Sequence, residues 1–222
     1  MTVQSTGILL STAYFPSIRY FSKLASFPEI YLEQHEHFIK QTYRNRTIIL
    51  GANGSISLIV PVEKGRGPKI KIKDLRIAYD EEWQRNHWRT IFSAYNSSPF
   101  FEYYADELEP FFRTKHEFLF DFNQSILEVL LEILELKVIL NQTVSFEQIP
   151  ENCMNFREKI NPKTHLNFSD PQFVPQPYTQ VFSEKFGFIP DLSILDLLFN
   201  EGPSTQQLLV SYFIKLNSLK LN

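Results

Sequence analysis

The fold is decided by residues 7–17, Gly7-Ile8-Leu9-Leu10-Ser11-Thr12-Ala13-Tyr14-Phe15-Pro16-Ser17. The apolar residues 7–10 predict a short buried strand, and the hydroxyl-bearing residues 11–16 predict a turn. Ser17 is a suitable helix cap, and Ile18, Phe21 and Leu24 follow at helical spacing. In an open α/β sheet such a loop lies at the carboxyl end of a strand, and the free N–H groups at the start of the helix favour anions.

A second strand is predicted to begin at residues 29–32, Glu29-Ile30-Tyr31-Leu32. Parallel pairing with the first strand would carry Tyr14 and His35 to the same edge of the sheet. The segment at that edge is unusually polar and reads Glu33-Gln34-His35-Glu36-His37-Phe38-Ile39-Lys40-Gln41-Thr42-Tyr43-Arg44-Asn45-Arg46. We interpret it as the rim of a cleft; the alternative is an exposed edge strand whose charges discourage pairing.

The side chains of this segment favour acid–base chemistry on an anionic ligand. His35 and His37 can carry a proton near neutral pH, with a neighbouring glutamate fixing the tautomer. Lys40, Arg44 and Arg46 suit a phosphate or carboxylate, although a solvated basic turn explains them equally well. A metal held by the two histidines is a weaker interpretation, because no HExxH or CxxC motif is present, and we predict none.

The rest of the chain predicts one domain with a mixed sheet flanked by helices, an α/β fold with α+β as the alternative. A hairpin is expected over residues 47–61, with Asn53-Gly54 supplying positive φ angles. Residues 63–68 form a charged loop, either a lid or a linker, and residues 69–73 alternate like an exposed strand. Helices are predicted at 81–95 with Asp80 as cap, at 100–112, at 124–136, at 191–201 with Asp191 as cap, and from a Ser204 capping box onward; a strand is predicted at 138–146. Residues 148–177 are Pro-rich and irregular, and they are interpreted as a lid, a docking arm or a disordered segment.

Two residues on apolar helix faces are candidates for the same site. His87 lies between apolar neighbours and is either a satisfied core histidine or a catalytic group in the cleft. Asp196 falls on the apolar side of its helix, where a carboxylate needs a partner. We expect Asp196 to pair with Arg44 or Arg46 beside the cleft.

Composition restricts the class of protein. The 222 residues carry a formal net charge of −3, so a broad basic surface for nucleic acid is not expected. Cys153 is the only cysteine, which excludes an intrachain disulfide and indicates a reducing compartment. We find no secretory signal, and the apolar run 126–140 contains four charged residues and cannot span a bilayer. The sequence is therefore interpreted as a cytoplasmic protein.

The chain resembles the WbqC-like protein family of bacterial O-antigen and surface-polysaccharide gene clusters. The resemblance rests on four segments: Tyr14-Phe15-Pro16 with Tyr20-Phe21; Phe38-Ile39-Lys40 with Tyr43-Arg44-Asn45-Arg46; Pro61-Val62 with Trp83 and His87; and Tyr178 with Phe182 through residues 192–202. Many members have Gln-Pro where Ser11-Thr12 stand and an Asp-Asp-Val-Gln-like run where residues 34–37 stand. This departure implies different chemistry or another acceptor.

The resemblance implies one WbqC-like domain over residues 1–222 and a part in polysaccharide biosynthesis. Our first hypothesis is a transferase of acyl or aminoacyl groups, such as glycine, onto an amino sugar carried by a nucleotide or a lipid. Its catalytic residues would be His35, His37 and His87, and its ligand-binding residues Tyr14, Lys40, Tyr43, Arg44, Asn45, Arg46 and Asp196. The alternatives are a non-catalytic binding or scaffold protein of the same pathway and a nucleotidyl-transferase-like enzyme. The partner is an anionic small molecule, such as a nucleotide sugar or an acyl donor, whereas the cofactor and the oligomeric state stay open.

Overall fold

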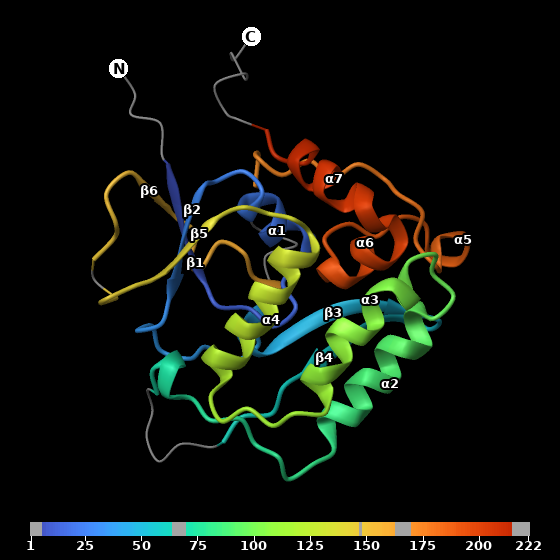
Figure 1. Cartoon of the computed structure of the whole chain (residues 1–222), viewed down its shortest axis with the longest axis horizontal. Helices are drawn as coiled ribbons and strands as arrows, with labels where there is room; N and C mark the ends of the chain where they lie inside the picture. Colours follow the sequence, from blue (N-terminus) through green and yellow to red (C-terminus); the bar gives the residue numbers. More distant parts are fainter. Residues whose placement is uncertain (1–5, 64–69, 147, 163–169, 215–222) are drawn as a thin grey trace.

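The structure, a computed structural model, describes residues 6–63, 70–146, 148–162 and 170–214. Helices and strands from the whole described chain pack into one body (Figure 1). In chain order the elements are β1 (Gly7–Ser11), α1 (Ile18–Leu24), β2 (Glu29–Glu33), β3 (Arg46–Gly51), β4 (Gly54–Ile59), α2 (Trp83–Tyr95), α3 (Phe101–Leu108), α4 (Leu119–Ile133), β5 (Ile139–Gln142), β6 (Cys153–Asn155), α5 (Ser183–Phe186), α6 (Ile194–Glu201) and α7 (Thr205–Ser211). The predicted α/β class, with parallel and antiparallel strands flanked by helices, is confirmed.

The main sheet has four parallel strands in the order β5-β2-β1-β6. All five residues of β1 are buried, which explains its continuous apolar run, because helices cover both faces of such a strand. Gly7 lies opposite Glu29 in β2 and opposite Cys153 in β6, and Ser11 lies opposite Glu33. The carboxyl ends of β1 and β2 therefore meet at one edge, as the sequence predicts.

The order of the strands creates a crevice beside β1. Counted within this sheet alone, the strands run 3-2-1-4, because the chain passes from β1 to β2 and β5 on one side and reaches β6 on the other. Ligands of open α/β sheets bind outside the carboxyl ends of the strands at the point where the order reverses. Here that point lies between the ends of β1 and β6.

The predicted hairpin forms a separate two-stranded antiparallel sheet from β3 and β4. Gly51 pairs with Gly54 across the turn, and Gly54 has a φ of 114°. Asn53 does not adopt a positive φ, so only the second residue of the Asn53-Gly54 pair behaves as expected. The hairpin packs through β3 against α2 and α6.

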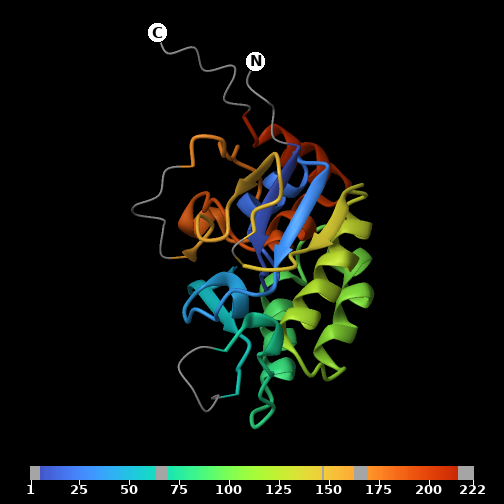
Figure 2. The same cartoon turned by 90° about the vertical axis from the view of Figure 1, so that its left-hand side faces the viewer.

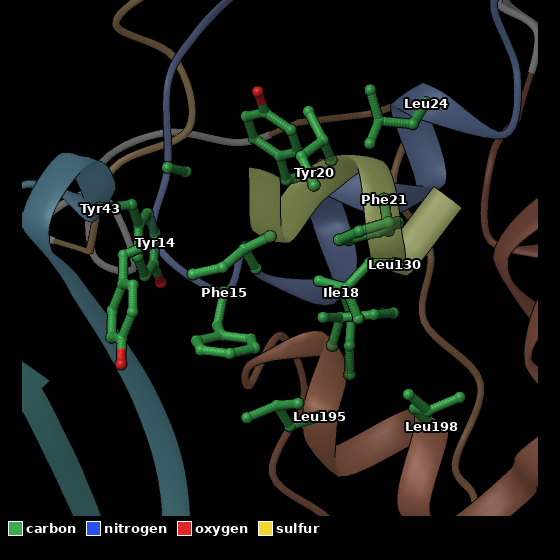
Figure 3. Packing of buried hydrophobic residues seen from close by; sticks show 14 of the residues in the cluster. Tyr14, Phe15, Ile18, Tyr20, Phe21, Leu24, Tyr43, Leu130, Leu195 and Leu198 are labelled. Atoms are coloured by element: carbon green, nitrogen blue, oxygen red, sulfur yellow. The ribbon is translucent and has the colours of Figure 1, made fainter. Parts of the chain in front are cut away.

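The core forms where α1 meets α4 and α6. Ile18 and Phe21 of α1 point toward Leu130 of α4 and toward Leu195 and Leu198 of α6 (Figure 3). All five are at most 1% exposed. Burying each such side chain contributes roughly 1.5–3 kcal/mol, so the helical face predicted from sequence spacing is what holds α1 in place.

Four local predictions are wrong because tertiary contacts override local pattern. Residues 69–73 were expected to form an exposed strand, but a 3-10 turn occupies Ile72–Asp74 and Ile72 is fully buried. The helix predicted at 124–136 begins earlier, since α4 runs Leu119–Ile133. Helix α2 begins at Trp83 and is not capped by Asp80. The irregular segment 148–177 contains β6, whose three residues are too few to show a period.

Two helix caps near the C-terminus also differ from prediction. Helix α6 is capped by Ser193, which accepts a bond from the amide of Leu195, rather than by Asp191, while Gly202 ends the helix as predicted. Ser204 makes no capping bond with its side chain. Apart from Glu63, the proposed lid or linker at 63–68 lies outside the described residues.

Candidate functional site at the carboxyl edge of the sheet

The amides at the start of α1, predicted to bind an anionic ligand, bind groups of the protein itself. The amide of Arg19 donates to Oδ1 of Asp191 at 2.9 Å, and its guanidinium lies 3.0 Å from Oδ2. Oγ of Ser17 accepts the amide of Tyr20 at 3.4 Å. The prediction is wrong for this structure, because the Asp191 carboxylate already compensates the positive end of the helix.

Arg44 forms a buried ion pair with Glu36 at the edge of the sheet. Its Nε donates to Oε1 at 2.7 Å, and its Nη2 donates to Oε2 at 2.5 Å and to Oγ of Ser11 at 2.9 Å. Burial raises the pKa of Glu36, and the Arg44 guanidinium opposes that shift. Two-point pairing of this kind fixes both side chains, so the charge of Arg44 is neutralised within the protein.

A second ion pair, which the sequence analysis missed, joins Arg157 to Glu33 across the sheet. Nη1 of Arg157 donates to Oε2 of Glu33 at 2.9 Å, and Nε donates to Oδ1 of Asn155 at 3.1 Å. Thr143 Oγ1 donates to Oε1 of Glu33 at 2.9 Å. The carbonyl of Arg157 accepts the Ser11 hydroxyl, which links the two ion pairs. Recognising Arg157 required knowing that β6 pairs with β1.

A small cavity lies at the crevice between β1 and β6. Its walls include Ser11 and Thr12 after β1, Tyr43 and Arg44 before β3, and Arg157 after β6. Its volume is about 10 Å³, which is room for about one water molecule. A substrate can reach this crevice only if one of the surrounding segments moves.

His35 is the predicted catalytic residue that the structure equips best as a base. Its amide donates to Oε1 of Glu33 at 2.7 Å, and its Nε2 lies 3.1 Å from the carbonyl oxygen of Thr143. A carbonyl can only accept a hydrogen bond, so Nε2 carries a proton, and in the neutral ring Nδ1 keeps its lone pair. The side chain is half-buried at the carboxyl end of β2, where a base can reach solvent or substrate.

The other polar residues of the segment divide into exposed and buried groups. His37 and Lys40 are exposed. Tyr43 and Asn45 are buried, and the Oη of Tyr43, the Oδ1 of Asn45 and the Nε of Arg46 have no hydrogen-bond partner among the described residues. Buried polar atoms normally have a partner, so such a concentration of unpaired atoms within four residues indicates a place for water or ligand.

His87 and Tyr14 meet in the aromatic core. Nδ1 of His87 lies 3.0 Å from the Tyr14 hydroxyl, and the ring packs edge-on against Trp83 with centroids 5.1 Å apart. Burial lowers the pKa of His87 to about 4. Both side chains therefore occupy positions typical of a satisfied core pair, the first of the two interpretations that the sequence left open.

Asp196 does not pair with Arg44 or Arg46, and that prediction is wrong. Its Oδ1 accepts the Tyr95 hydroxyl at 3.0 Å, and its Oδ2 accepts the Tyr178 hydroxyl at 2.5 Å and Nε2 of Gln180 at 2.8 Å. Burial raises the pKa of Asp196, although these three hydrogen bonds oppose the shift. Neutral donors, two of them from Tyr178 and Gln180, take the place of the expected cation. The sequence did not indicate this, because that part of the chain shows no periodicity from which its position could be predicted.

Two further observations concern a metal site and a membrane-spanning helix. Over residues 6–63, 70–146, 148–162 and 170–214, no cluster of three or more His, Cys, Asp or Glu side chains has an arrangement that could hold a metal ion. In the same described part of the chain, every helix is too short or too polar to cross a membrane.

The strand order and the polar edge define an open α/β protein with a parallel sheet. A model of the WbqC-like protein family matches residues 12–167, and the chain belongs to this family, as the resemblance predicted. The chain is 25% identical over 219 residues to the uncharacterized protein Rv1507c of Mycobacterium tuberculosis, in an alignment that covers 87% of this chain and 93% of the relative. No solved structure matches the chain.

Proposed function

We propose that this protein is a transferase of bacterial surface-polysaccharide biosynthesis. It moves an acyl or aminoacyl group, such as glycine, to the amine of an amino sugar carried by a nucleotide or a lipid. Membership of the WbqC-like family supports the pathway, because the resemblance to this family implies a part in polysaccharide biosynthesis. A cytoplasmic location is part of the proposal and is supported by the single cysteine, since a disulfide-dependent extracellular fold would need more.

The observation that carries the enzymatic proposal is the hydrogen bond from His35 to the Thr143 carbonyl. It leaves Nδ1 as a base at the edge where open α/β sheets bind ligands. The sugar amine attacks the acyl carbonyl carbon and forms the C–N bond. The bond from that carbon to the donor group breaks, and the leaving group takes the electron pair. His35 accepts the amine proton and returns it to the leaving group.

Two cations of the polar segment remain for the anionic part of the substrate. Arg44 is neutralised by Glu36, whereas the described residues give Lys40 and Arg46 no ion-pair partner. Lysine and arginine side chains suit a diphosphate, and the 3-2-1-4 strand order supports a nucleotide by analogy with other doubly wound sheets. The same analogy is what favours the nucleotidyl-transferase-like alternative.

The test is an assay with nucleotide-linked amino sugars as acceptors and acyl-CoA or an activated glycine as donor, followed by mass spectrometry of the sugar product. The proposal expects a sugar heavier by one acyl group. His35→Gln should abolish the product while the protein stays folded, and Lys40→Gln should raise KM for the nucleotide sugar. A matched His87→Gln variant should keep the activity. Full turnover by His35→Gln would reject the catalytic role.

A non-catalytic binding or scaffold protein is the second candidate, and the closed crevice favours it. Both arginines beside β1 are paired with glutamates, and the cavity between them holds about one water molecule. Under this alternative, a nucleotide sugar raises the melting temperature but no product forms with any donor. The nucleotidyl-transferase-like alternative instead expects release of pyrophosphate from a nucleoside triphosphate.

A further inference from the structure

The edge strand β5 presents unpaired backbone groups to the outside. Figure 2 shows the yellow strand β5 at the outer edge of the sheet, beside α4. The amides of Ile139 and Thr143 donate inward, to the carbonyls of Pro28 at 2.8 Å and Leu32 at 3.0 Å. Because backbone groups of a strand alternate in direction, those of Leu140 and Gln142 face outward, where the described residues offer them no backbone partner.

A groove with an apolar floor runs beside this edge. Its volume is about 580 Å³, and its floor is formed by Leu131 of α4, Leu136 and Val138 of the connection that follows, and Leu140 of the edge strand. Leu131 is buried, and the other three side chains are half-buried. An extended chain paired with β5 would place alternate side chains over this floor.

The rim of the groove is acidic. Glu128, Glu132 and Glu135 line it, against the single cation Lys137. Glu128 accepts a hydrogen bond from Gln124, whereas no ion pair is formed by Glu132 or Glu135 within the described part of the chain. The groove therefore favours a partner that brings positive charge, and a second copy would bring three more glutamates.

The edge also lacks the usual protection against pairing. Residues 138–146, Val138-Ile139-Leu140-Asn141-Gln142-Thr143-Val144-Ser145-Phe146, contain no charged residue and no proline. Ile139 is 60% exposed and Val144 is 78% exposed. Natural edge strands are commonly blocked by lysine, proline or a bulge, so an apolar and uncharged edge indicates a surface that is covered by a partner.

We propose that β5 and its groove bind an extended segment of another protein as an added fifth strand of the sheet. Apolar side chains at alternate positions of this segment fill the groove, and its flanking lysine or arginine side chains meet Glu132 and Glu135. Main-chain hydrogen bonds to Leu140 and Gln142 supply affinity, and the groove and its charges supply specificity. This interaction is independent of the transferase proposal and holds for the scaffold alternative as well.

The test uses a fluorescent peptide, Arg-Lys-Val-Thr-Val-Thr-Val-Lys-Arg, and the full chain, with binding followed by anisotropy at low salt. Two matched peptides carry glutamate in place of each basic residue or N-methyl groups along the backbone. The proposal expects the basic peptide to bind and both matched peptides to bind about tenfold more weakly or worse. Gln142→Pro removes an outward N–H but no hydrogen bond to β2, and it should weaken binding similarly. Glu132→Lys should have the same effect. Asp106→Lys on the exposed side of α3 should leave it unchanged.

Several results would overturn the proposal. Equal binding of the N-methylated peptide would show that no strand is added, and equal binding of the acidic peptide would show that the rim plays no part. If the basic peptide does not bind, the proposal is also rejected. Light scattering that finds a dimer dissociated by Gln142→Pro would assign the edge to a second copy instead. If Gln142→Pro does not fold, Glu132→Lys and the N-methylated peptide decide the question.

Discussion

Acidification should destabilise this protein through His87. Burial lowers the pKa of His87 to about 4, from an ordinary value of 6.5. As the pH falls below 6.5 the unfolded chain takes up a proton at this residue and the folded protein does not. The contribution of His87 to stability is therefore complete above that pH and is lost progressively down to about pH 4.

The magnitude follows from the two pKa values. Between about pH 7.5 and about pH 5 the unfolded state gains roughly 2 kcal/mol from protonation of His87, because one pKa unit corresponds to about 1.36 kcal/mol. Glu36 and Asp196 act in the opposite direction, since their raised pKa values favour the folded state as they become protonated. The wild-type pH dependence alone therefore does not isolate the histidine.

The assay compares urea unfolding of the wild type and of His87→Gln at both pH values. Gln keeps a polar partner for the Tyr14 hydroxyl, which lies 3.0 Å from the ring nitrogen. The free energy of unfolding of the wild type should fall by about 2 kcal/mol more than that of the variant. His37→Gln, a change at an exposed side chain, is the control and should behave like the wild type. Equal pH dependence in wild type and His87→Gln would refute the buried neutral histidine.

Three other predictions concern stability and are checked by urea or thermal unfolding. Arg44→Met should cost about 3–5 kcal/mol because it leaves the Glu36 carboxylate buried without its cation, whereas replacing both partners by apolar residues should cost less; equal costs would contradict this. Asp196→Asn should cost about 1–3 kcal/mol, because an amide nitrogen cannot accept the hydroxyl bonds that the carboxylate accepts, and an unchanged melting temperature would argue against that network. Gly202→Ala should destabilise, since φ is 51° and the added Cβ would lie 2.5 Å from the Phe100 ring; Gly54→Ala, also at positive φ but with open space, separates strain from collision and should cost less.

The sequence predicted only those residues of the candidate site that lie close together in the chain. His35, Glu36 and Arg44 are close in the chain, and the polar run after a strand is visible without coordinates. Their partners lie far away in sequence: Ser11 joins Arg44 from 33 residues back, and Arg157 joins Glu33 from 124 residues ahead. Pairing between side chains depends on which strands become neighbours, and a single sequence carries no record of that.

The buried carboxylate of Asp196 shows the same difference between local and long-range information: its burial was predicted correctly, and its partner was not. The apolar face of α6 showed that Asp196 must be buried, because helical spacing is a local property. Its partner depended on how residues 178–180 return to the helix, and tyrosine and glutamine rather than arginine satisfy the carboxylate.

The amino-acid sequence was enough to predict the local elements whose signals repeat within a few residues. These are the buried strand β1 and the helix after it, the hairpin at Gly54, and the apolar faces of α1 and α6. The strand order, the fourth strand β6 and the partners of Glu33, Glu36, Asp191 and Asp196 depend on how the whole chain packs. The reason is physical: backbone periodicity and side-chain spacing act over one or two turns, whereas a buried charge is satisfied by whichever donors the complete packing brings within about 3 Å.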